Sequence, residues 1–225
     1  MTKHPKDRLY EELARIGRAF AAPRRLELLD LLAQAPRTVE DLAGLCRTSV
    51  ANTSQHLQVL RAAGLVASEK EGLFVTYRLA TKEVATFSLQ LQSLAESRLA
   101  EMDRVKQELF TSAADLEPVD GKELLARVRR GEVLLLDVRP AEEYAAGHLA
   151  GAISIPHDEV KRRLAELPRG RAIVAYCRGP YCVFAGEVVK LLRRRGFEAT
   201  RIETGVAAWQ ARGLPVELGA SAALR

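Results

Sequence analysis

Residues 172–185 read AIVAYCRGPYCVFA, and they carry the clearest structural signal in the second half of the chain. The apolar run Ala172–Tyr176 predicts a buried strand that ends directly before Cys177. The glycine and proline that follow predict a tight turn, and a helix is expected from there to about Arg195. In open parallel sheets the chemistry lies at the carboxyl ends of the strands, so Cys177 is a candidate nucleophile.

The loop after this cysteine has the features of an anion cradle. A cysteine placed before a tight turn and a helix N-terminus faces backbone N–H groups and the positive end of the helix dipole. Both features lower the pKa of a thiol, and Arg178 adds a cation beside it. The same cradle would stabilise a persulfide or a bound thiosulfate. The loop residues are Arg178, Gly179, Pro180, Tyr181, Cys182 and Val183.

Two anion chemistries use such a loop, and residue spacing separates them. A cysteine phosphatase needs an arginine six positions after its nucleophile, where it holds the phosphate with two hydrogen bonds. Position 183 is a valine, so phosphatase activity is disfavoured. Sulfur transfer needs only the thiolate, the loop amides and a cation. The loop therefore favours sulfane-sulfur chemistry.

Short strands alternate with helical segments through residues 119–218, which is typical of an α/β domain with a mostly parallel sheet. Asp120-x-x-Glu123 predicts a capping box at the first helix. Residues 133–136 predict a buried strand, and a further strand is expected at residues 153–155.

These motifs together resemble the rhodanese family of sulfurtransferases. The resemblance implies that Cys177 takes sulfane sulfur from a donor such as thiosulfate, polysulfide or a persulfide, carries it as Cys–S–SH and passes it to a thiol acceptor. It also implies that Asp137 and Arg139 support the active loop and that Trp209 packs in the core. The matching segments are residues 136–139, 143–144, 147–152, 155–156, the Cys177 loop and residues 205–209.

Cys182 has two interpretations. It is either a small residue at a helix start, or a resolving thiol that attacks a persulfide or sulfenate on Cys177. A spacing of five residues makes contact feasible, but a bridge also requires Cα atoms within about 7 Å. The chain has three cysteines, which form no disulfide framework and indicate a reducing compartment.

The first half of the chain shows helical periodicity that ends in one alternating stretch. Residues 65–70 and 73–78 flank a Glu-Gly pair and predict a β-hairpin. The order of helices followed by a hairpin predicts a winged helix-turn-helix, whose second helix enters the major groove of DNA. The signals for helix starts and ends are Pro23, Thr38-x-x-Asp41, Ser49 and Gly64.

The helix that begins after Ser49 carries the candidate DNA contacts. Amides and hydroxyls suit base edges because they donate and accept hydrogen bonds, whereas cations bind phosphate at any sequence. A merely solvated polar face is the alternative. The candidate residues are Ser49, Val50, Asn52, Ser54, Gln55 and His56 on the helix, with Lys70 and Arg78 on the hairpin.

Residues 5–105 resemble the ArsR family of winged-helix regulators, on residues 38–45, 49–60, 62–66 and 77–79. The resemblance implies a homodimer, built on helices at residues 5–20 and 81–110, that binds a palindromic operator in double-stranded DNA. Metal-sensing members carry cysteines near residues 38–42 or His/Asp clusters in the dimer helix. This chain has neither pattern, so no metal site and no cofactor are expected.

Composition agrees with a multi-domain chain. The 225 residues carry 34 Lys and Arg against 29 Asp and Glu, a net charge of +5 that is spread evenly. No apolar run approaches the roughly 20 residues of a membrane helix, and no signal peptide is recognised, so we expect a cytoplasmic protein without a membrane partner. We place a mainly α winged helix-turn-helix domain at 1–111, a linker at 112–118, the α/β rhodanese domain at 119–218 and a tail at 219–225.

The two halves lead to one hypothesis with two rivals. The hypothesis is a DNA-binding regulator in which reactive sulfur, or an oxidant, modifies Cys177 and changes operator affinity through the helix at residues 81–110. The first rival is an independent sulfurtransferase that is only tethered to a regulator. The second is a non-catalytic module that binds an anionic metabolite or a partner protein.

Overall fold

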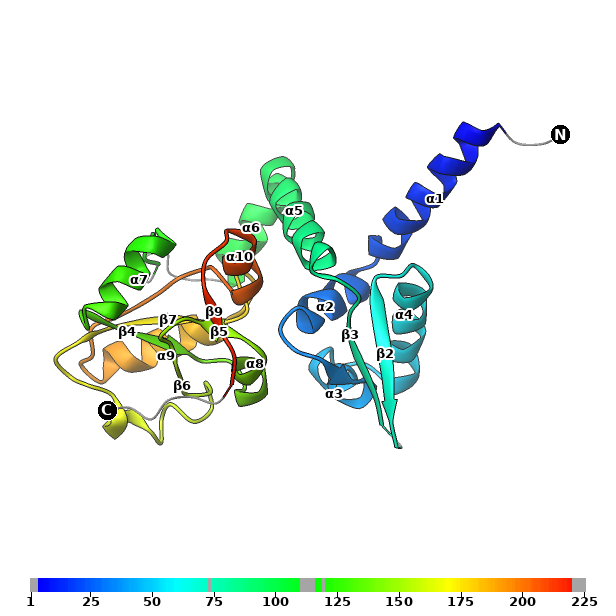
Figure 1. Cartoon of the computed structure of the whole chain (residues 1–225). Helices are drawn as coiled ribbons and strands as arrows, with labels where there is room; N and C mark the ends of the chain where they lie inside the picture. Colours follow the sequence, from blue (N-terminus) through cyan, green and yellow to red (C-terminus); the bar gives the residue numbers. More distant parts are fainter. Residues whose placement is uncertain (1–3, 73, 110–115, 119, 220–225) are drawn as a thin grey trace. The chain divides into compact units, whose positions relative to one another are not determined.

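The computed structural model describes residues 4–72, 74–109, 116–118 and 120–219 (Figure 1). The chain forms two units that divide between Leu91 and Gln92, inside α5 (Lys82–Arg98). Most of the linker predicted at 112–118 lies outside the described residues, so the domain limits stay a prediction. Of that linker, Leu116 forms a parallel bridge to Arg201 in the second unit.

The first unit is a winged helix-turn-helix, as predicted. Its three strands form an antiparallel sheet in the order β1-β3-β2, and its helices enclose a core that includes Leu28, Leu42 and Leu57. The elements are α1 (Pro5–Phe20), α2 (Pro23–Leu32), β1 (Arg37–Thr38), α3 (Val39–Leu45), α4 (Val50–Ala62), β2 (Val66–Glu71) and β3 (Phe74–Leu79).

Local signals fix the ends of the two central helices. The Asp41 N–H donates to Thr38 Oγ1 at 3.2 Å, and the Thr38 N–H donates to the Asp41 carboxylate at 3.3 Å, which completes the predicted capping box of α3. The Asn52 N–H donates to Ser49 Oγ at 3.2 Å and caps α4. Beyond its other end, Gly64 has φ +72°, a conformation that favours glycine.

The single helix predicted at residues 81–110 is wrong. The structure has α5 (Lys82–Arg98) and α6 (Ala100–Leu109), which are separated at Leu99. Lys106 Nζ lies 3.2 Å from Glu96 Oε1, whereas ten residues of straight helix span about 15 Å, so the ion pair favours the break. Neither proline nor glycine occurs there, and periodicity alone therefore predicted one helix.

The second unit is an α/β domain with the predicted parallel sheet. Four parallel strands lie in the order β6-β4-β7-β8, and β5 pairs antiparallel with β9. The elements are α7 (Gly121–Arg129), β4 (Val133–Asp137), α8 (Ala141–Ala146), β5 (His148–Leu149), β6 (Ile153–Ser154), the 3₁₀ turn η2 (Leu164–Glu166), β7 (Ala172–Tyr176), α9 (Phe184–Arg194), β8 (Ala199–Arg201), α10 (Val206–Ala211) and β9 (Val216–Glu217).

Alternate residues of the central strands supply two cores, one on each face of the sheet. Leu136 and Ile173 pack with apolar residues of α9, whereas Leu135 and Val174 pack in a second cluster with Trp209. Every residue of β4 is buried, as expected for a strand covered on both faces. The predicted core position of Trp209 is confirmed.

The capping box predicted at the start of α7 is only half formed. The Lys122 N–H donates to Asp120 Oδ1 at 2.8 Å, so Asp120 does cap the helix. Glu123 instead forms an ion pair with Arg130 at 3.1 Å. The Glu123 carboxylate therefore pairs with Arg130 and does not take the capping role that the spacing predicted.

Candidate functional site: a two-cysteine loop on a buried charge network

The loop between β7 and α9 holds two cysteines against each other. Cys177 is only 3% exposed, whereas Cys182 is half-buried. The Cys177 thiol donates to the carbonyl oxygen of Cys182 at 3.4 Å, and the two thiols are close enough to shift each other's pKa. The contact that the five-residue spacing made feasible is thus present between the Cys177 side chain and the backbone of Cys182.

Backbone amides converge on both sulfur atoms. The N–H groups of Gly179 and Ala185 face Cys177, and those of Arg178 and Phe184 face Cys182. Phe184 and Ala185 are the first residues of α9, so the helix N-terminus supplies half of these donors. The anion cradle stays a prediction, because the Cys177 thiol itself donates to the carbonyl oxygens of Cys182 at 3.4 Å and of Gly179 at 4.0 Å.

The negative charge of the reduced loop lies on Cys182, and the prediction of a lowered pKa for Cys177 is wrong. Burial raises the pKa of the Cys177 thiol, and its contact with Cys182 raises it further. The hydrogen bond from Cys177 lowers the pKa of Cys182 to about 7, in spite of burial. Sequence spacing located the amides, but it did not show that the first thiol is sealed from water.

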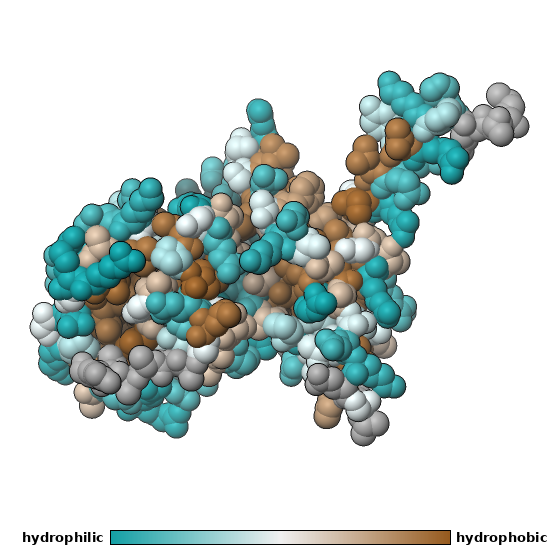
Figure 2. All heavy atoms as spheres, viewed as in Figure 1, coloured by the Kyte–Doolittle hydropathy of each residue, from teal (hydrophilic) through white to brown (hydrophobic). Residues whose placement is uncertain are grey.

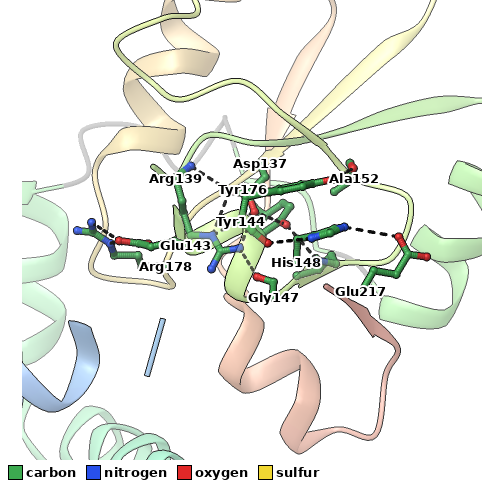
Figure 3. A network of polar contacts seen from close by, with 11 residues as sticks. Asp137, Arg139, Glu143, Tyr144, Gly147, His148, Ala152, Tyr176, Arg178 and Glu217 are labelled. Atoms are coloured by element: carbon green, nitrogen blue, oxygen red, sulfur yellow. Dashed lines mark hydrogen bonds and ion pairs between the residues drawn. The ribbon is translucent and has the colours of Figure 1, made fainter. Parts of the chain in front are cut away.

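Arg178 is engaged in an ion pair. Its guanidinium donates to the Glu143 carboxylate through Nη2 at 2.6 Å and Nε at 3.0 Å (Figure 3). Glu143 lies on α8 and is fully buried. The arginine therefore fastens the loop to α8, and its charge contributes only secondarily to the low pKa of Cys182.

A second buried ion pair lies behind the loop. Arg139 donates to Asp137 through Nη2 at 2.6 Å and to the Gly147 carbonyl oxygen at 2.7 Å (Figure 3). The hydroxyl of Tyr176 donates to the same carboxylate at 2.5 Å. Because Tyr176 directly precedes Cys177, this network holds the end of β7 from which the loop departs.

The rest of the loop is also fixed by specific contacts. Gly179 has φ +148°, a conformation that a side chain would strain. The Tyr181 hydroxyl donates to Glu96 Oε1 at 2.9 Å, within the second unit. Pro180 is half-buried, and Val183 is the residue before the first turn of α9.

Sequence reasoning missed the roles of Glu143 and Gly205 beyond their place in the matching motifs. Glu143 lies 35 positions before Arg178, and no local pattern connects them. A Cβ atom at Gly205 would collide with the carbonyl oxygen of Arg178, so only glycine lets the start of α10 lie this close to the loop. The one signal in the sequence for the role of Gly205 is its position directly after Thr204.

The candidate DNA-binding residues are mostly at the surface. On α4, Val50, Asn52 and Gln55 are exposed, Ser54 and His56 are partly exposed, and the capping residue Ser49 is exposed. On the hairpin, Lys70 and Arg78 are both exposed. The register pairs Lys70 with Val75 and Arg78 with Ala67, so the two cations project from opposite faces of the wing.

The described part of the chain carries no candidate metal cluster and no candidate membrane span. Within it, no cluster of three or more His, Cys, Asp or Glu side chains has the arrangement of a metal site. Over the same residues, no helix is both long enough and apolar enough to cross a membrane.

The charge assignment predicts the order of thiol reactivity. Iodoacetamide reacts with thiolates, so Cys182 is expected to be alkylated first, at a rate that rises through about pH 7 and then levels, while Cys177 stays slow. In Cys177→Ala the hydrogen-bond donor is lost, and the midpoint for Cys182 is expected to move up toward that of an ordinary thiol. Peptide mass spectrometry after timed alkylation measures both, with Cys46→Ala as control. Faster labelling of Cys177 at neutral pH would contradict the assignment.

The Arg178–Glu143 pair is expected to stabilise the second unit strongly. Arg178→Ala removes this partner from the buried Glu143 carboxylate and is expected to lower the free energy of unfolding by about 3–5 kcal/mol. The double variant Glu143→Gln/Arg178→Met removes both charges and is expected to lower it by less. Urea unfolding followed by the fluorescence of Trp209, the only tryptophan, reports on this unit. Arg163→Ala breaks a more exposed pair and is the control, with an expected loss of about 0–1 kcal/mol. Equal losses of unfolding free energy for the two arginine variants would refute the strong stabilisation by the Arg178–Glu143 pair.

Comparison with known proteins agrees with both halves. Residues 120–212 match the rhodanese-like domain, and residues 22–68 match the bacterial regulatory protein, arsR family. The homodimeric winged helix-turn-helix DNA-binding domain Mb0332 from Mycobacterium bovis, a solved structure, is 37% identical and covers 45% of this chain and 94% of its own, with a TM-score of 0.41.

Full-length similarity connects the halves. A sulfurtransferase of Allochromatium vinosum is 30% identical over 100 residues, 44% of this chain and 92% of that protein. The HTH-type transcriptional regulator Rv0324 of Mycobacterium tuberculosis is 44% identical over 215 residues, which cover 96% of this chain and 94% of that protein. The chain therefore belongs to the ArsR family of winged helix-turn-helix transcriptional regulators and carries a rhodanese-like domain at its C-terminal side.

Proposed function

We propose that this regulator takes up sulfane sulfur as a persulfide on Cys177 and that the modified loop changes the affinity of the winged helix for its operator. The observation that carries the proposal is the placement of Cys177 within 3.4 Å of the Cys182 backbone, at the start of α9, where the loop amides lower the pKa of each thiol. Fixed amide donors suit the anion that a persulfide carries at neutral pH. Thiosulfate, polysulfide or a small persulfide is the donor, and a thiol is the acceptor.

The two cysteines divide the work of sulfur uptake. The Cys182 thiolate accepts the proton of Cys177 while Cys177 attacks the donor, so Cys177 acts as the nucleophile although its own pKa is the higher. Cys177 then forms a bond to the outer sulfur of the donor, and the donor's S–S bond breaks with its electron pair on the departing group. Because Arg178 is held by Glu143, the amides and the start of α9 stabilise the new anion.

A homodimer of the winged-helix unit is part of the proposal. On α1, the apolar residues Leu9, Tyr10 and Leu13 are 68%, 60% and 65% exposed. Figure 2 shows brown, apolar atoms gathered along this helix. Exposed apolar faces of this kind mark interaction surfaces, and a second copy of the same helix is the partner that the family relationship supports. Two copies would place two α4 helices on a palindromic site.

The link between the two functions runs through α5 in this proposal. Val84, near its start, is buried in the core of the first unit. Glu96, near its end, accepts a hydrogen bond from Tyr181 of the loop and pairs with Lys106. A change in the loop that alters the Tyr181 contact would act on the helix that also belongs to the DNA-binding unit.

The test joins sulfur uptake and DNA binding on the same samples. With thiosulfate, the wild-type protein is expected to load sulfur and Cys177→Ser to load none, as measured by the sulfite released and by the thiocyanate formed with cyanide. Operator affinity at fixed salt is expected to change by about 5–150-fold only in the wild type. Uptake with unchanged affinity would support an independent sulfurtransferase. Thiosulfate binding without uptake would support a non-catalytic anion-binding module.

The DNA contacts are tested separately. Gln55→Ala is expected to cost about 1–3 kcal/mol on the operator and to relax sequence preference, because its amide suits a base edge. Arg78→Ala is expected to weaken all sequences alike and to reduce the salt slope by about 1. Titrations at several salt concentrations measure both effects. Lys122→Ala removes an exposed cation from the second unit and serves as control. If Gln55→Ala and Arg78→Ala both bind like the wild type and the Lys122→Ala control, the groove assignment fails.

A further inference from the structure

We propose that the persulfide on Cys177 is resolved inside the loop by Cys182, which yields a Cys177–Cys182 disulfide and free sulfide. This inference rests on the proposed function, because it begins from the Cys177 persulfide. It assigns to Cys182 a chemical role in ending the sulfurated state. It also predicts that the lasting product of exposure to sulfane sulfur is a disulfide.

Contacts within the loop place Cys182 for this attack. The Cys182 N–H donates to the Gly179 carbonyl oxygen at 3.2 Å, which closes a turn and folds the second cysteine back over the first. Cys177 Sγ lies 3.4 Å from the Cys182 carbonyl oxygen, so the inner sulfur of a Cys177 persulfide would lie beside Cys182. Cys46 is buried in the core of the first unit, where its raised pKa keeps it protonated, and it takes no part.

The charge of Cys182 suits a nucleophile. Its pKa of about 7 makes a large fraction thiolate at neutral pH, and the N–H groups of Arg178 and Phe184 hold the sulfur in place. It is also more exposed than Cys177, which is 3% exposed. A serine or alanine at this position would fit the same loop without that chemistry.

The step balances without an added oxidant. The Cys182 thiolate attacks the inner sulfur of Cys177–S–SH, the Cys177–Cys182 bond forms, and the bond to the outer sulfur breaks with its electron pair on that atom. The outer sulfur, which arrived as sulfane sulfur, leaves reduced as HS⁻. The two cysteine sulfurs are oxidised to the disulfide. A thiol or dithiol reductant returns the loop to its starting state.

The bridge changes the loop as well as its chemistry. A disulfide requires an S–S distance of about 2.05 Å, far shorter than a thiol–thiolate hydrogen bond. Residues between the two cysteines must therefore shift when the bond forms. Tyr181 directly precedes Cys182, so the shift is expected to alter the hydrogen bond from Tyr181 to Glu96 first.

Thiosulfate is the donor of choice for the test, because loading then releases sulfite and only resolution releases sulfide. Full-length wild type, Cys182→Ser and Cys177→Ser are incubated with thiosulfate, blocked with N-ethylmaleimide and analysed without reduction. The wild type is expected to lose two hydrogen atoms in intact mass and to release one sulfide per bridge, at a rate that rises through about pH 7. Cys182→Ser is expected to load more slowly, because it lacks the base for Cys177, so it is compared after its sulfite release shows complete loading. It is then expected to keep one extra sulfur on Cys177 and to release no sulfide.

The outcomes separate this inference from the proposed function. If wild type and Cys182→Ser both retain the extra sulfur equally, the resolving role is refuted and the persulfide stands. If a bridge forms without sulfide, direct oxidation replaces the proposed step. If no protein takes up sulfur from thiosulfate or from glutathione persulfide, the proposed function falls and this inference falls with it.

Discussion

The buried ion pair of Asp137 and Arg139 is the constraint on which the second unit depends. Removing two charges from water is costly, and the pair is tolerated only because further groups satisfy it. Tyr176 donates to the carboxylate, and the Gly147 carbonyl oxygen accepts from the guanidinium. These partners come from the end of β7 and the end of α8. Because both segments bind the same charge pair, their positions are fixed. The cysteine loop is held between them.

The second ion pair, between Glu143 and Arg178, positions the cysteine loop on this framework. Glu143 follows shortly after Arg139 in the chain and is buried against the loop, where it fixes Arg178 with two geometrically distinct hydrogen bonds. A free arginine would have offered a mobile charge to an incoming anion. A fixed one leaves the anion to the amides, which are already oriented and cost no reorganisation. The site therefore relies on backbone geometry, and Gly205 permits it because no side chain stands between α10 and the loop.

What the sequence predicted correctly was local. The strand–cysteine–turn–helix order, the capping box at Thr38 and the left-handed Gly64 all depend on neighbouring residues, and all are confirmed. The pairing of Glu143 with Arg178 depends on two segments that are distant in the sequence and meet only in the fold, so no spacing rule predicts it. The break at Leu99 has no breaking residue to mark it. The reversal of charge between the two cysteines follows from burial, which sequence spacing does not measure.

The position of the two thiols bears on what kind of signal such a regulator carries. A persulfide exchanges with any accessible thiol, so it follows the balance of sulfur donor and acceptor from moment to moment. A disulfide in a half-buried loop persists until a reductant attacks it. Because Cys177 is buried and Cys182 only half-buried, a reductant reaches Cys182 first and must displace Cys177 as the leaving group. The raised pKa of the Cys177 thiol makes it a poor leaving group, and this slows the return to the reduced state.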